Sequence, residues 1–168
     1  MLAQAPAVEL DLLAILFRVL HTTCAGTLLG GLVYMRFVLA PAAASDGADI
    51  YAGRRAAWAK CVGVCTALLL ASGSYNFWVI ITQYQKPAFP YHMVFGIKIL
   101  LAFAVFALMA LLAGKTDAAA KLQAQLGRWL NITLAMVLAI FLLGAVLKSI
   151  PKVPAAAEPP ATPAPAVE

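Results

Sequence analysis

The first long apolar run of the chain, residues 12–40, carries Arg18 and His21 in its first half. Ionisable groups inside a bilayer are costly and rare, and they usually face a bundle interior or a cavity. Arg18 and His21 lie about one helical turn apart. A neutral imidazole is a good axial ligand for haem iron, and a guanidinium can hold carboxylates through charge-assisted hydrogen bonds. The pair therefore predicts a binding site rather than a plain anchor.

A second polar pair, His92 and Lys98, lies in the apolar run 91–113. With a rise of about 1.5 Å per residue, Lys98 lies roughly 10 Å into its run and His21 roughly 13 Å into the first. Because both runs are expected to enter from the same side, His21 and Lys98 should lie at similar depth. His92 is expected near the interface, about 120° around the helix from Lys98.

These four side chains gather positive charge where the apolar runs contain no acidic residue. An unpaired positive cluster in a low dielectric needs an anion, such as porphyrin carboxylates or lipid headgroups. We therefore predict Arg18, His21, His92 and Lys98 as cofactor-binding residues, with His21 and His92 as candidate metal ligands. The alternatives are that Arg18 snorkels to headgroups, that His92 is an ordinary interfacial residue, and that His21 makes a helix–helix hydrogen bond.

The composition places these residues in a membrane protein. Hydrophobic residues make up 64% of the 168 residues and charged residues only 11%, against about 25% charged in soluble domains. Four apolar runs are long enough for spans of about 20 residues. They cover residues 12–40, 58–81, 91–113 and 129–148. We expect one all-α domain, residues 1–150, that forms an integral membrane four-helix bundle with short loops.

Several features between and within the runs carry further predictions. Pro41 with the sequence 45–47 should end the first helix, and residues 118–127 should form a short amphipathic lead into the fourth. The Gly26-x3-Gly30 spacing is typical of close helix packing. The three cysteines lie within the predicted spans and are expected to be packing residues rather than a disulfide framework or a metal pair. They are Cys24, Cys61 and Cys65. The proline- and alanine-rich tail, residues 151–168, should be disordered or polyproline II unless a partner holds it.

Basic residues near the run ends set the expected orientation. The first and third connections carry Arg36, Arg54, Arg55, Lys60, Lys115, Lys121 and Arg128. The opposite side carries Arg18, Lys86, Lys148 and Lys152. This asymmetry predicts both termini outside the cytoplasm, with a bacterial inner membrane as the location. The net charge of +5 is accordingly read as topology, and no nucleic-acid partner is expected.

The order and spacing of several residues resemble a known family over residues 17–148. The residues are His21, Gly31, Tyr34 and Arg36, then Arg54-Arg55 and Gly73, then Lys98, and finally Arg128-Trp129-Leu130-Asn131. This pattern resembles the bacterial four-helix protoporphyrinogen oxidase family, which belongs with the copper-resistance D membrane proteins. The chain departs from the family pattern at Met35, Ile132 and Thr133. The resemblance implies b-type haem and a functional pair of first-helix histidine and third-helix lysine, here His21 and Lys98.

The function expected from these residues is haem- or porphyrin-binding redox chemistry, with haem b as the cofactor, His21 as ligand, and Lys98 or His92 as its partner. One alternative is a copper-handling membrane protein, since Cu(I) favours methionine and cysteine ligands and Met93 adjoins His92. Another is a non-catalytic accessory subunit whose tail docks in a larger membrane complex. The expected partners are the lipid bilayer and either such a complex or further copies of the chain.

Overall fold

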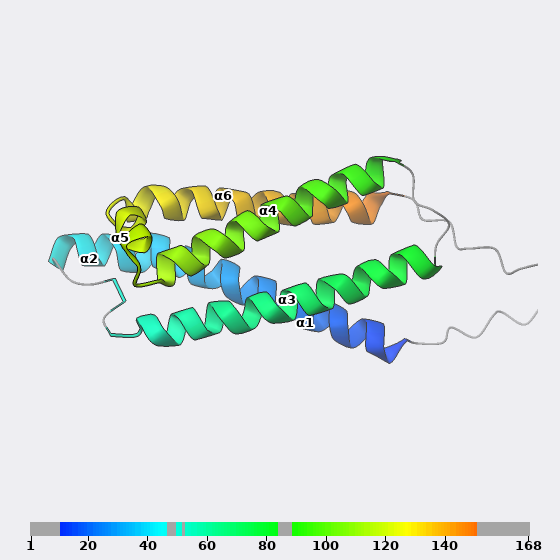
Figure 1. Ribbon diagram of the computed structural model, residues 1–168, viewed down its shortest axis with the longest axis horizontal. Coiled ribbons are helices and arrows are strands. Elements are labelled where there is room, and N and C mark those ends of the chain that lie inside the picture. The colour runs from blue at the N-terminus through cyan, green and yellow to red at the C-terminus, as the bar shows by residue number, and fades with distance from the viewer. Residues whose placement is uncertain (1–10, 47–49, 52, 84–88, 151–168) are drawn as a thin grey trace, which may run out of the picture.

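The computed structural model describes residues 11–46, 50–51, 53–83 and 89–150, and every regular element within those ranges is helical. Four long helices form the body of the molecule (Figure 1). They are α1 Leu12–Tyr34, α3 Arg55–Gln83, α4 Phe89–Ala113 and α6 Leu126–Ser149. Two short helices, α2 Ala40–Asp46 and α5 Asp117–Gln123, lie in the connections. The expected tail, residues 151–168, falls outside the described residues.

The four long helices are membrane spans, so the chain is an integral membrane helical bundle, as its composition predicted. The segments long and apolar enough to cross a bilayer are Leu12–Ala42, Arg55–Thr82, Tyr91–Ala113 and Leu126–Ser149. Large apolar side chains cover the outside of the bundle; Leu100 and Leu142, for example, are 71% and 67% exposed. Lipid tails are as apolar as leucine, so such an outer face is stable in a bilayer.

The bundle is built from two helix pairs. Helix α1 packs chiefly against α3 and α4 chiefly against α6, while contact between the pairs is sparser. Figure 1 shows the α1–α3 pair below and the α4–α6 pair above. The two pairs pack together at a hydrophobic core that contains Leu32, Met109 and Leu130, which are at most 1% exposed. The sparse contact elsewhere leaves room between the pairs.

The first helix was expected to end at Pro41 and residues 45–47. It continues past Pro41 but ends at Asp46, so the prediction was wrong for Pro41 and correct for residues 45–47. The chain continues from α1 through a π-helical turn, η1 Met35–Leu39, into α2, which contains Pro41. The Ala40 N–H donates to the Met35 carbonyl, five residues back. A proline ring inside a helix clashes with the carbonyl four residues before it, which is that of Phe37. The wide π turn lies at this point and gives the ring the space that a regular α turn lacks.

The carbonyls at the end of α4 are capped by side chains from other segments. Arg55 Nη1 donates to the Gly114 carbonyl and to Gln123 Oε1, both at 2.9 Å. Gln123 Nε2 donates to the Leu112 and Gly114 carbonyls at 2.9 and 3.0 Å, and Tyr51 Oη also donates to Leu112. These donors satisfy terminal carbonyls that the helix itself leaves unpaired. They also fix α5, the short helix expected within residues 118–127, against the end of the bundle.

The glycine that allows close approach on the first span is Gly31. A Cβ built on Gly31 would lie 2.6 Å from Trp58 Cζ3, so the indole packs directly on the backbone of α1. A Cβ on Gly26 or Gly30 would meet no atom within 4 Å beyond the helix's own backbone. The prediction that Gly26-x3-Gly30 forms the packing surface was therefore wrong. One residue of helix rotation, about 100°, separates Gly30 from the face that contacts α3.

Gly31→Ala is expected to destabilise the folded protein by about 1–3 kcal/mol, because the added methyl overlaps a half-buried indole that is packed against the core. Thermal unfolding in detergent measures the effect. Gly30→Ala is the matched control, since it adds the same methyl to the neighbouring position in open space. Equal melting temperatures for the two variants would contradict the assigned packing of Trp58.

Candidate functional site

A cavity of about 290 Å³ lies between the two helix pairs and receives side chains from all four spans. Its walls are almost entirely apolar, with aliphatic and aromatic side chains such as Leu28, Phe106 and Ile140. Its ionisable lining residues are His21 from α1 and Lys98 from α4. The structure thus places these two residues on one hollow, where the depth argument expected them.

His21 is oriented by a buried serine on the neighbouring helix. The His21 Nδ1 and Ser72 Oγ atoms are 2.9 Å apart, and Ser72 is fully buried. Ser72 Oγ also donates to the Leu68 carbonyl at 2.6 Å. A hydroxyl has a single proton, so Ser72 accepts the second hydrogen bond from His21 Nδ1–H. This assignment puts the proton of the neutral imidazole on Nδ1 and leaves the lone pair on Nε2, the tautomer suited to ligation through Nε2.

The sequence analysis did not identify Ser72 as a functional residue. The serine falls within the predicted second span, and its depth was readable from the sequence. Its partner was not readable, because contact with His21 depends on how α1 and α3 are rotated against each other. Gly73 follows it on α3, and a Cβ there would lie 3.6 Å from His21 Cε1. The imidazole therefore packs against α3 at a position that has no side chain.

Lys98 lies on the other side of the cavity and is half-buried. A Cβ built on Gly144 would lie 3.5 Å from Lys98 Nζ, so the amine packs over the glycine of α6. Among the described residues, no acidic side chain forms an ion pair with Lys98 and no hydrogen bond to its amine is found. Burying a charged amine in an apolar cavity without a counter-charge costs free energy. An anionic ligand would supply the missing counter-charge.

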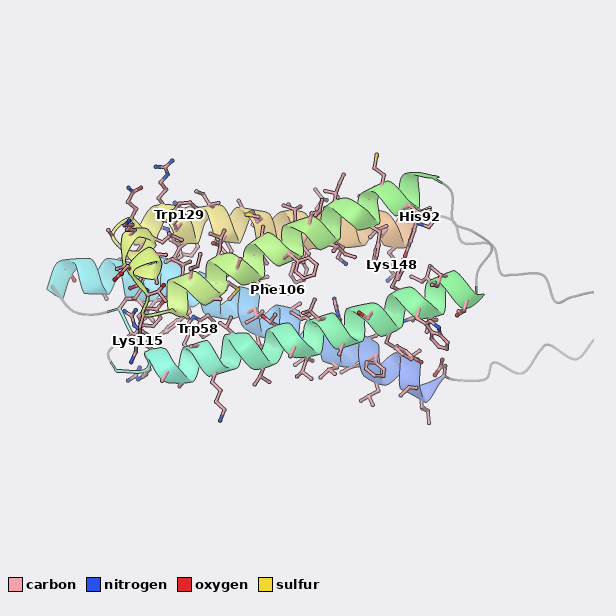
Figure 2. The ribbon with its side chains drawn as sticks, viewed as in Figure 1. Trp58, His92, Phe106, Lys115, Trp129 and Lys148 are labelled. Atoms are coloured by element: carbon pink, nitrogen blue, oxygen red, sulfur yellow. The ribbon has the colours of Figure 1, made fainter. Side chains whose placement is uncertain are left out.

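Arg18 and His92 do not line the cavity, so the expected cluster of four cationic groups is not formed. Both side chains are exposed. His92 lies at the same end of the bundle as Lys148 (Figure 2), and its ring packs edge-on to Tyr91 with centroids 6.0 Å apart. The angular offset of His92 from Lys98 along α4 explains why only Lys98 faces inward. His21 and His92 therefore do not act together on one metal in this arrangement.

The three cysteines meet inside the bundle. The Cys65 thiol contacts those of Cys24 and Cys61, and all three are free. Cys24 and Cys65 belong to the buried hydrophobic core, with Cys61 packed against it, in the packing role predicted from sequence. Within the part of the chain that the structure describes, no set of three or more histidine, cysteine or acidic side chains is placed to hold a metal ion.

The chain was compared with known proteins, and its function is inferred below from the geometry of the cavity. No protein-family model, curated protein or solved structure matches the chain.

Proposed function

We propose that this protein is an integral membrane haem- or porphyrin-binding redox protein, with His21 as the ligand and Lys98 as the partner of a carboxylate. The observation that carries the proposal is the cavity itself. It combines an imidazole whose assigned tautomer leaves the Nε2 lone pair available, an amine that pairs with no acidic side chain among the described residues, and walls that are otherwise apolar. Haem, when bound, would supply one-electron chemistry, and the ligating histidine and the polarity of the surrounding pocket would set its potential.

The residues that line the cavity match the chemistry of a haem or porphyrin. The volume of the cavity limits how much of such a ring it can enclose. Ligand pockets usually measure about 300–1,000 Å³, so a cavity of about 290 Å³ is at the small end. A porphyrin bound there would have part of its ring outside the hollow, between the helix pairs. The sparse contact between the pairs is compatible with that placement.

Absorption spectroscopy tests the proposal directly. The protein is purified in mild detergent, incubated with haem, and freed from excess haem by gel filtration. We expect a Soret band with about one haem per chain, as one ligating histidine on one cavity implies. Absence of a Soret band after this treatment would refute the proposal.

Ser72→Ala is expected to weaken haem binding by about 10–100-fold, the usual effect of removing the partner that orients a ligating histidine. Without Ser72 Oγ, the imidazole loses the acceptor that holds its proton on Nδ1. Haem titration followed at the Soret maximum measures the change. Ser149→Ala is the control, because that exposed serine bonds only to the Val146 carbonyl at the end of α6. Unchanged affinity in Ser72→Ala would contradict the assigned tautomer.

We also propose membership of the superfamily of protoporphyrinogen oxidase-like and copper-resistance D membrane proteins. Residues that carry the resemblance contact one another between helices, which supports a shared arrangement. His21 packs on Gly73, and Arg36 Nε donates to Asn131 Oδ1.

The proposed location is a bacterial inner membrane, with both chain termini outside the cytoplasm. Figure 2 shows Trp58, Lys115 and Trp129 together at one end of the bundle. Basic residues near span ends favour the cytoplasm, and tryptophans favour the interface, so this end is assigned to the cytoplasmic side. His92 and Lys148 mark the opposite end. Labelling of single cysteines introduced at Lys115 and Lys148, in a variant lacking the native cysteines, tests the orientation in intact cells.

A further inference from the structure

The cavity has an opening on the side of the bundle. Five of its lining residues are also exposed at the molecular surface. One of them, Phe141, lies on α6; the other four lie on α3 and α4, and they are Leu70, Ser74, Ile99 and Phe103. Phe103 is 54% exposed and Leu70 41%. All four lie well inside membrane-spanning segments, so the opening between α3 and α4 faces lipid rather than water. We call this opening the lateral mouth.

The cavity is closed toward both ends of the bundle. Toward the end that carries His92, the Phe77 and Phe95 rings stack with centroids 4.5 Å apart and join α3 to α4. Tyr91, 2% exposed, adds a ring at 6.1 Å from Phe95. Toward the opposite end, the packed core around Met109 and Leu130 fills the space between the helix pairs. The side route is therefore the open one.

The charges of the cavity indicate what enters by this route. The mouth and walls are apolar apart from Ser74, His21 and Lys98, and they require a ligand with an apolar body. Lys98 contributes a positive charge that no described acidic side chain balances. Carboxylates form short, charge-assisted hydrogen bonds with such an amine, which are about twice as strong as neutral ones. A lipid-soluble carboxylate satisfies both requirements.

We propose that the cavity is loaded laterally from the bilayer, through the lateral mouth, with a lipid-soluble carboxylate whose head group pairs with Lys98. This inference deepens the proposed function and rests on it for the porphyrin, whose carboxylates supply the same chemistry as the head of a long-chain acid. Lateral entry also removes the volume conflict, because the part of a large ligand that exceeds the hollow stays in the mouth among lipid tails.

Photocrosslinking in proteoliposomes tests the route without haem. The probe is a diazirine analogue of palmitate dissolved in the vesicle lipid, and crosslinked positions are mapped by mass spectrometry. We expect labelling of cavity residues such as Phe77 and Phe106. Ser74→Trp, which places an indole in the mouth, should lower this labelling at least about tenfold, as should Lys98→Met, a factor that corresponds to about 1.4 kcal/mol.

The matched control is Val64→Trp, which adds an indole to an exposed position of α3 outside the cavity lining and should leave the labelling unchanged. Leu70→Trp serves as a second blocked variant if Ser74→Trp unfolds. Cavity labelling that persists in both blocked variants would overturn the lateral route. Labelling that persists in Lys98→Met would overturn the pairing with the amine.

A haem arm separates this inference from the proposed function. Haem is supplied either within vesicles or in water as its albumin complex, and the rise of the Soret band is followed. We expect loading from vesicles to be faster and to be slowed at least about tenfold, or 1.4 kcal/mol, by Ser74→Trp. A Soret band that forms equally fast in Ser74→Trp overturns the lateral route and leaves haem binding intact. Palmitate labelling without any Soret band refutes haem binding and supports the lateral route.

Discussion

His21→Ala is expected to reduce haem occupancy to below about one-tenth of that of the unsubstituted protein, because the His21 imidazole is the strongest ligand that the cavity would offer to haem iron. The cavity contains His21 as its imidazole, and Ser72 holds that ring in one orientation. The measurement is the Soret absorbance per chain after reconstitution and gel filtration. Added free imidazole should restore part of the band, since the alanine leaves a space of matching shape.

His92→Ala is the matched control for this prediction. It removes the same chemical group from the same protein, but from an exposed position at the end of α4, outside the cavity. Its Soret band should equal that of the unsubstituted protein. Loss of the band in His92→Ala together with its retention in His21→Ala would move the site to the end of the bundle and refute the assignment.

The membrane spans and the similar depth of His21 and Lys98 were predictable from sequence because both depend on position along a helix axis. The length of an apolar run indicates a span, and the fixed rise per residue converts position into depth. Alternating spans then determine which side each run enters from. These rules use no information about how the helices are rotated, and they were sufficient to place an imidazole and an amine at one level.

Rotation around the helix axis is what the sequence did not determine. In a soluble bundle the apolar stripe reveals which side of a helix faces inward. In lipid the outside is as apolar as the core, so no such stripe marks the inner face. The assignment of Arg18 to the site, the choice of Gly30 over Gly31, and the omission of Ser72 all follow from this missing coordinate. The prediction that the first helix ends at Pro41 failed for a different reason: the π turn before Pro41 lets the helix continue through the proline.

Lys98→Met is expected to have two opposite effects. Without a ligand, the variant should be more stable by about 1 kcal/mol or more, because an amine without a counter-charge is removed from an apolar cavity. That gain corresponds to a rise in melting temperature of about 2–4 °C. With a carboxylate ligand, affinity should fall about 10–100-fold, the range given by losing a hydrogen bond to a charged group worth about 1.5–3 kcal/mol.

If Lys98 serves binding at a cost in stability, its replacement should raise the melting temperature and lower the affinity. If Lys98 were purely structural, its replacement should lower the stability of the protein. Lys148→Met is the control, since Lys148 is exposed at the end of α6 and does not line the cavity; neither its melting temperature nor its affinity should change. Paired thermal unfolding and haem titration in the same detergent give both quantities for each variant. A Lys98→Met protein that melts lower than the unsubstituted protein and binds haem equally well would show that the amine supports the fold and not the ligand.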